Sequence, residues 1–205
     1  MKANYKNAIL ITITLSAFWL NGIRAQQYQP LPDSNASWLV WEGSSEYTIY
    51  HNWFLSDFQN DTTINGSIYT KLFYTVYGLN SMEYSGAFRS ESNGKGYYVP
   101  NGEQQEVLLQ DFTKQQGDTV YNVAVHALSY LGSFDFIVDS VNYFPCGPFI
   151  LKSIALHSIE MIPLIFETSL HWVEKIGSFS GGILNQPEMG LNVYNLICQS
   201  TSDTI

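Results

Sequence analysis

The sequence predicts an all-β fold, a single antiparallel meander that closes as a barrel, with a two-sheet sandwich as the alternative. After residue 25, nearly every segment alternates between apolar and polar residues with period two, which is typical of half-buried strands. Three Asn-Gly pairs stand between such segments, and Asn-Gly is a strong signal for a tight hairpin turn. No segment has the 3.6-residue period of an amphipathic helix.

The expected strands follow one another along the chain with short turns between them. Asn65-Gly66, Asn93-Gly94 and Asn101-Gly102 mark three hairpins in the first half, and Gly117-Asp118 marks a fourth turn. A barrel or sandwich buries so many half-apolar strands without leaving long open edges. The strands are expected at 47–55, 61–64, 67–77, 88–90, 97–99, 106–112, 119–127, 133–144, 149–157, 161–166 and 170–176.

Residues 1–25 have the pattern of a cleavable signal peptide. Lys2 and Lys6 precede an apolar run from residue 8 to residue 20 that is too short for a membrane anchor, and Ala25 is the small residue that cleavage requires. The mature chain, 26–205, has a length that suits a single all-β domain. We therefore expect an exported protein, located in the periplasm, at the cell surface or outside the cell, with no membrane span after the signal is removed.

Charge narrows the range of partners. Removal of the signal takes Lys2, Lys6 and Arg24 from the nine basic residues and leaves all 18 acidic ones, so the net charge changes from −9 to −12. Such a surface repels phosphate backbones and anionic lipid, so nucleic-acid binding is not expected. Acidity also keeps secreted proteins soluble, and it indicates no particular ligand.

The chain has two cysteines, Cys146 and Cys198. In an oxidising compartment a lone pair of cysteines predicts one disulfide, with two buried free thiols as the alternative. A bridge would connect the C-terminal segment to the corner at 145–148. Neither cysteine has the C-x-x-C spacing or the basic neighbour of a reactive thiol.

Several motifs, in this order, span most of the mature chain. They are YQPL at 28–31 followed by Trp38, DTTINGSIYTKL at 61–72, LLQDF at 108–112 with GDT at 117–119, and WVEKIGS at 172–178. Together they resemble secreted Bacteroidetes proteins of uncharacterised function, which often precede a sorting domain of the type IX secretion system. This sequence ends at Ile205, soon after Cys198, and we expect no sorting domain in it. The resemblance implies no assigned reaction.

Glu174 is the first candidate site residue. If Leu170, Trp172 and Ile176 face the core, strand alternation places Glu174 on the same inward face, where an unpaired carboxylate is costly. It then needs a partner or a function. Arg89, the sole arginine after the signal, could hold the carboxylate through its planar fork. We expect a buried network or, alternatively, a ligand-binding site at these two residues.

Aromatic residues near turns are the second group of candidates. Trp41 and Tyr97 could stack on a sugar ring or grip a peptide, although aromatic residues also fill the faces of ordinary strands. No metal or cofactor is expected, because the four histidines lack ligand spacing and no calcium loop is present.

No catalytic set is legible in the sequence. There is no Gly-x-Ser-x-Gly elbow, and no pair of carboxylates stands out among the acidic residues. The sequence therefore favours a secreted, non-catalytic module that binds glycan, peptide or a cell-surface protein. A structural domain of the cell envelope and a glycan hydrolase with an acidic pair are the alternatives.

Overall fold

The computed structural model describes residues 27–33, 36–43, 48–54, 61–76, 81–127, 130–160, 169–179, 184–185 and 193–201. The predicted signal peptide and the strand expected at 161–166 lie outside these residues. The described part forms thirteen strands and no helix, so the all-β prediction is confirmed. No described helix is long and apolar enough to cross a membrane.

The strands are β1 (Ala36–Gly43), β2 (Thr48–Phe54), β3 (Asp61–Ile64), β4 (Ser67–Val76), β5 (Glu83–Ser90), β6 (Lys95–Pro100), β7 (Val107–Asp111), β8 (Thr119–Ala127), β9 (Tyr130–Cys146), β10 (Phe149–Ser158), β11 (Ser169–Val173), β12 (Gly177–Ser178) and β13 (Val193–Thr201). The first hairpin forms where Asn-Gly predicts it. Asn65 and Gly66 both have positive φ, 50° and 83°, as a tight turn between β3 and β4 requires.

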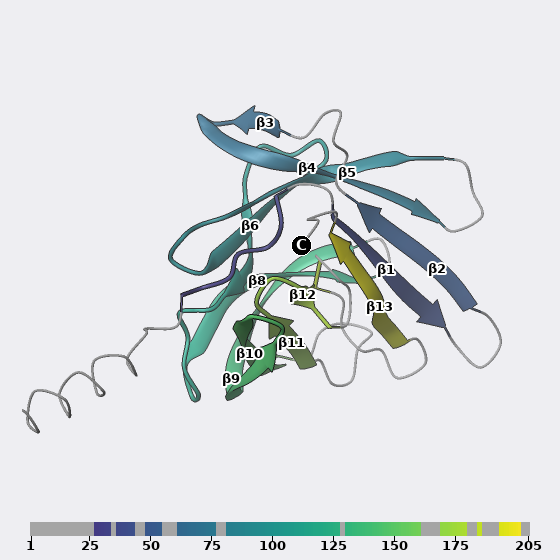
Figure 1. The fold of residues 1–205 in the computed structure, drawn as a ribbon. Helices are drawn as coiled ribbons and strands as arrows, with labels where there is room; N and C mark the ends of the chain where they lie inside the picture. Colours follow the sequence, from purple (N-terminus) through teal and green to yellow (C-terminus); the bar gives the residue numbers. More distant parts are fainter. Residues whose placement is uncertain are drawn as a thin grey trace, which may run out of the picture.

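The strands form one sheet in the order β12-β11-β10-β9-β8-β7-β6-β5-β4-β2-β1-β13, with β3 paired to β4 (Figure 1). Among the described strands no pairing joins β12 to β13, so the sheet is open and the predicted barrel closure is not supported. The single sheet also differs from the alternative of a two-sheet sandwich. One junction between described strands departs from antiparallel pairing, because β7 and β8 pair in parallel through Leu108 and Val123.

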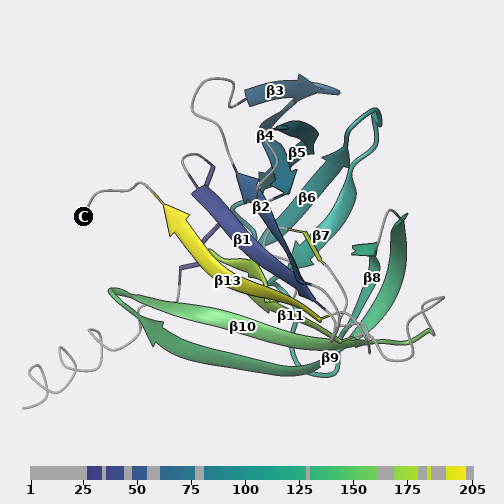
Figure 2. The same ribbon diagram turned by 90° about the vertical axis from the view of Figure 1, so that its right-hand side faces the viewer.

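The sheet is strongly curled. Strands β3 to β5 lie at one end of the molecule and β9 to β11 at the other, in both views (Figures 1 and 2). Although the sheet does not close through its backbone, Trp38 on β1 donates its indole N–H to the carbonyl of Ile176, between β11 and β12, at 2.6 Å. A side-chain hydrogen bond thus connects two regions near opposite ends of the strand order.

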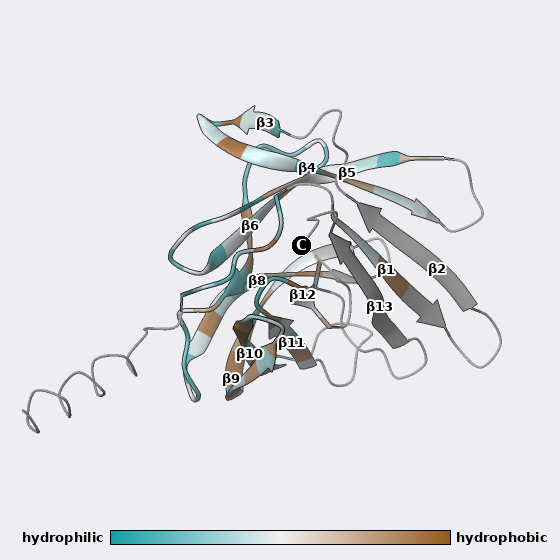
Figure 3. Cartoon of the chain, in the orientation of Figure 1, coloured by the Kyte–Doolittle hydropathy of each residue, from teal (hydrophilic) through white to brown (hydrophobic). Residues whose placement is uncertain are grey.

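Two hydrophobic cores stabilise the curl. Hydrophobic segments appear on β1 and on the β9–β10 hairpin in Figure 3, and these strands contribute to different cores. Both cores are apolar and nearly free of exposed surface, so each stabilises the fold through buried area. The first contains Leu31, Ala36, Trp38, Val40, Leu72, Phe88, Tyr98, Leu109, Ala124 and Leu184. The second contains Phe112, Val120, Val123, Val125, Phe136, Val138, Ile154, Leu156, Leu170 and Trp172.

Asn185 bridges the weak junction between β7 and β8. Its amide nitrogen donates to the carbonyls of Leu109 on β7 and Ala124 on β8, at 2.6 and 2.9 Å. Its amide oxygen accepts from the indole N–H of Trp172, at 2.9 Å. Because only one residue pair connects β7 and β8, the Asn185 side chain supplies hydrogen bonds that a longer ladder would supply itself.

Cys146 is a free, exposed cysteine at the end of β9. The structure therefore does not support the predicted disulfide between Cys146 and Cys198. The two cysteines belong to strands with different partners: Cys146 lies opposite Phe149 across the β9–β10 turn, and Cys198 lies opposite Leu39 of β1. The side chain of Cys198 is outside the described residues.

Candidate functional site

Glu174 is buried, as the alternation of 170–176 predicts, with 3% of its surface exposed. The strand ends earlier than expected, at Val173, and Glu174 begins the turn that leads to β12. Its backbone N–H donates to the carbonyl of Lys152, and its carboxylate accepts from the backbone N–H of Lys152 at 2.9 Å. Glu174 is thus fixed to β10 through both its main chain and its side chain.

Lys175 holds this turn in an uncommon conformation. Its φ of 67° is in the left-handed region, which costs free energy for a residue with a side chain. Its N–H donates to the carbonyl of Gln29, at 3.0 Å, and its ammonium group lies over the ring of Phe149, 4.3 Å from the centroid. The turn therefore connects the N-terminal segment to the sheet directly beside Glu174.

Lys152 is the cation of the same region. It lies on β10 between Leu151 and Ser153, and only 5% of the residue is exposed. Its ammonium group donates to the carbonyls of Phe112 and Lys114, at 2.6 and 2.8 Å. Burial lowers the pKa of Lys152, while the nearby carboxylate of Glu174 acts in the opposite direction.

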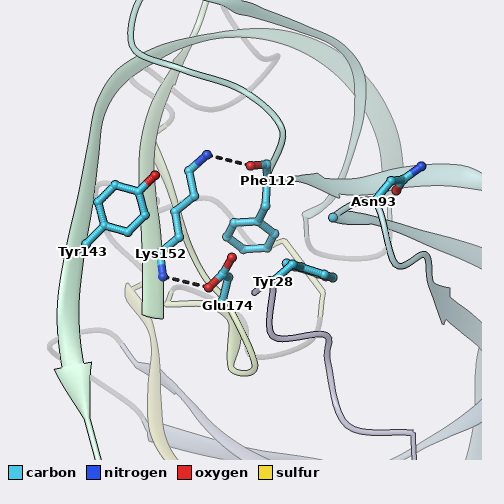
Figure 4. Close-up of a pocket in the computed structure, with 7 residues that line it drawn as sticks. Tyr28, Asn93, Phe112, Tyr143, Lys152 and Glu174 are labelled. Atoms are coloured by element: carbon cyan, nitrogen blue, oxygen red, sulfur yellow. Dashed lines mark hydrogen bonds between the residues drawn. The ribbon is translucent and has the colours of Figure 1, made fainter. Parts of the chain in front are cut away.

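Lys152 and Glu174 line a half-open pocket of about 170 Å³ together with Tyr28, Asn93, Gly94, Phe112 and Tyr143 (Figure 4). In Figure 4, Lys152 lies between the ring of Tyr143 on one side and Phe112 and Glu174 on the other. The lining residues come from the N-terminal segment, the β5–β6 turn, the end of β7, β9, β10 and the β11–β12 turn. Segments distant in the sequence therefore build this one pocket.

Three aromatic rings form most of the apolar wall. Tyr28 packs against Phe112 with 5.7 Å between ring centroids, and Phe112 packs against Trp172 in the core behind it. Burial raises the pKa of Tyr28 to about 12, so its hydroxyl is neutral at physiological pH. Tyr143 is more open, with 52% of its surface exposed.

The acidic content of the pocket limits its chemistry. Glu174 is the one carboxylate among the lining residues. The neighbouring buried acid, Asp111, accepts hydrogen bonds from the N–H and the hydroxyl of Thr113. Hydrolysis of a glycoside by an acidic pair needs two carboxyl groups facing one bond, and the described lining supplies one.

Arg89 does not pair with Glu174 as we expected. Its fork makes a bidentate ion pair with Glu106, with both bonds at 2.9 Å, and a further bond to Glu91 at 2.6 Å. The pKa values of Glu91 and Glu106 are lowered chiefly by these bonds to Arg89. Glu91 in turn accepts from the side-chain amide of Asn93, at 2.7 Å, so a chain of hydrogen bonds through Glu91 and Asn93 connects Arg89 to the pocket rim.

Tyr97 belongs to the Arg89 cluster and not to the pocket lining. The guanidinium carbon of Arg89 lies 4.4 Å from the ring centroid of Tyr97 and 5.6 Å from that of Tyr69. Tyr97 thus stacks on a cation of its own chain, which is a structural use of the ring. The backbone of Trp41 lies in β1 opposite Tyr50 and Asn195, and its side chain is outside the described residues.

Sequence reasoning missed Lys152, Tyr28, Asn93 and Tyr143 as pocket residues. Lys152 left the clearest signal, because a lysine in the apolar run FILKSIAL needs either a solvent-facing position or buried partners. The other three come from segments whose meeting no local pattern reveals. Within the described part of the chain, no group of three or more His, Cys, Asp or Glu could hold a metal ion.

No protein-family model, curated protein or solved structure matches this chain. The resemblance to secreted Bacteroidetes proteins stays a prediction.

Proposed function

We propose that this protein is an exported, non-catalytic binding module whose ligand enters the pocket at Glu174 and Lys152. The observation that carries the proposal is the composition of the wall: three aromatic rings, an exposed amide and one oppositely charged pair surround about 170 Å³. Binding sites for small molecules combine apolar walls with a few fixed polar groups in this way. The volume suits a single sugar ring or the end of a short chain.

Support for a binding role also comes from how the charged groups are held. The Lys152 ammonium donates to two backbone carbonyls, and the Glu174 carboxylate accepts from a backbone N–H. Groups fixed in this way lose little conformational entropy when a ligand arrives. The signal peptide supports export, and the remaining surface is acidic, which favours a ligand without a large negative charge.

Binding to a panel of soluble glycans and short peptides tests the proposal. We expect Tyr143→Ala to weaken binding by tenfold or more, because it removes an aromatic wall. Tyr121→Ala is the matched control, since Tyr121 is similarly exposed, at 61%, and does not line the pocket. No binding to any member of the panel, or equal losses in the two variants, would contradict the proposal.

A structural role at the cell envelope is the second candidate, and one observation favours it. The β9–β10 hairpin exposes Phe144 and Ile150, at 36% and 57%, close to its turn, and residues 140–151 carry no charge. Exposed apolar groups of this kind mark contact surfaces. If assembly is the function, the wild type should form oligomers in solution and Ile150→Ser should be monomeric by light scattering.

A further inference from the structure

Lys152 carries a buried ammonium group whose bonds within the protein leave one donor hydrogen unused. The residue is 5% exposed, and its ammonium group donates to the carbonyls of Phe112 and Lys114. A protonated amine has three donor hydrogens, and no third acceptor bonds to this one among the described residues. The two carbonyls tie β10 to the segment after β7, but they do not use the full hydrogen-bonding capacity of the side chain.

The charge of Lys152 also lacks a counter-ion. None of the ion pairs of the described residues includes Lys152. A lysine is rarely buried without a paired charge, because the loss of water around an ammonium group is costly. Backbone carbonyls offset part of that cost, and an anion bound in the pocket would offset more of it.

The ammonium group is placed where a ligand can reach it. Lys152 and Phe112, whose carbonyl accepts from the ammonium, both line the half-open pocket. Tyr143 lies directly opposite Lys152 across β9 and β10, so the two side chains share one face of the hairpin. Tyr143 is 52% exposed, and a group that enters the pocket beside its ring therefore meets the Lys152 side chain (Figure 4).

The second charge of the pocket lies at the other end of Lys152. The Glu174 carboxylate bonds to the main-chain N–H of Lys152, and the ammonium group bonds to the Phe112 carbonyl. Figure 4 shows these two bonds at opposite ends of the lysine. The length of the side chain therefore separates a ligand anion at the ammonium from Glu174. A single carboxylate suits this arrangement, because a phosphate or a second negative charge would add repulsion from Glu174.

Charge and hydrogen bonding together define the ligand group. A carboxylate accepts a charge-assisted hydrogen bond from an ammonium group, and such bonds are roughly twice as strong as bonds between neutral groups. It therefore gains more from the unused donor than a sugar hydroxyl does. The rings of Tyr28, Phe112 and Tyr143 contact the rest of the ligand. A sugar acid and the C-terminal end of a peptide both carry a carboxylate beside a part that suits these walls.

We propose that the ammonium group of Lys152 is the specificity-determining group of the pocket and binds a single carboxylate of the ligand. The inference rests on the proposed function, because it names the ligand class of the same site. It predicts a preference that a purely structural lysine would not produce. A lysine that only ties β10 to the segment after β7 contributes to stability, but it does not distinguish an acid from the corresponding amide.

The test measures the affinity of the full chain for two acid–amide pairs. Glucuronate with glucuronamide represents a sugar acid, and N-acetyl-trialanine with its C-terminal amide represents a peptide end, so the pairs distinguish the two sources of the carboxylate. We expect the wild type to bind the acid of at least one pair about tenfold or more tightly than its amide. Lys152→Met should remove this preference. Lys114→Met is the matched control and should keep it, because the Lys114 ammonium donates to the carbonyl of Thr119 and does not line the pocket.

The melting temperature of each variant shows whether it folds. Lys152→Met takes a donor from the carbonyls of Phe112 and Lys114, so a lower melting temperature is expected and the acid–amide preference is the deciding measurement. If Lys152→Met does not fold, Lys152→Gln replaces it, since glutamine keeps an N–H donor without the charge.

The outcomes separate the inference from the proposed function. If a ligand binds in a manner that depends on Tyr143, but the wild type binds neither acid more tightly than its amide, the inference is wrong and the proposed function stands. A preference that survives the loss of the Lys152 ammonium, or that Lys114→Met also loses, overturns the inference as well. If no acid, amide, panel glycan or panel peptide binds the wild type, both proposals fall together.

Discussion

Lys152 and Glu174 are buried where β10 meets the turn after β11, whereas Arg89 and Glu106 form a bidentate ion pair that is partly exposed. The buried residues bond mainly to backbone groups, and the exposed residues bond to each other. When a side chain of the buried region is removed, the backbone group that it bonded is left without a partner and away from water. At the partly exposed ion pair, water can take the place of the lost partner. We therefore expect the loss of stability on substitution to increase with the burial of the residue and not with the number of ion pairs that it forms.

Asn185 provides the largest test of this ranking. Asn185→Leu should lower the free energy of unfolding by about 3 kcal/mol or more, because two carbonyls and one indole N–H lose their partner in the interior. Denaturant unfolding measures the change. Asn142→Leu is the control, since Asn142 is exposed and its side chain bonds only to Ser140 in the described part of the chain. Equal effects would show that burial of the amide does not decide its contribution.

The same substitution, Glu to Gln, can be made in the buried region at Glu174 and in the partly exposed ion pair at Glu106. Glu174→Gln should cost about 1 to 2 kcal/mol, since it removes a negative charge near the buried cation of Lys152 and weakens the hydrogen bond to the Lys152 backbone N–H. For a chain of this size such a loss lowers the melting temperature by roughly 2 to 8 °C. Glu106→Gln should lower it by less, because solvent screens that pair. The comparison fails if the exposed variant melts lower than the buried one.

The sequence predicts most single strands but not how distant segments meet. The strand expected at 119–127 matches β8, and the turn at Asn65-Gly66 forms, because periodicity and turn chemistry act over a few residues. We missed β1 and β13, whose pairing places Ala36 opposite Thr201. No local pattern encodes a contact over that separation. The structure does not support the predicted barrel closure, because no pairing among the described strands joins β12 to β13.

The site shows the same division between local and distant information. Alternation predicted that Glu174 is buried, and the guanidinium fork of Arg89 does hold a carboxylate in two places. The carboxylate expected to pair with Arg89 was the wrong one, because whether Arg89 meets Glu106 or Glu174 depends on which strands are neighbours.

Arg89→Met should give the smallest effect on stability at neutral pH. Its ion pairs are partly exposed, so their loss should cost about 1 kcal/mol or less, and high salt should reduce the cost further. The same variant should change how the stability of the protein depends on pH in the acid range. Because Arg89 lowers the pKa values of Glu91 and Glu106 in the folded state, the unfolded state binds more protons as pH falls.

The stability that these carboxylates contribute is therefore complete above their ordinary pKa of 4.5 and is lost as pH falls below it. In Arg89→Met the stability should fall less steeply as pH decreases, because the two pKa values then return toward 4.5 and folding releases fewer protons. Unfolding free energies of wild type and variant between about pH 3 and pH 7 measure the difference. If the two curves stay parallel over that range, the exposed pair does not control the acid response, and the buried groups must account for it.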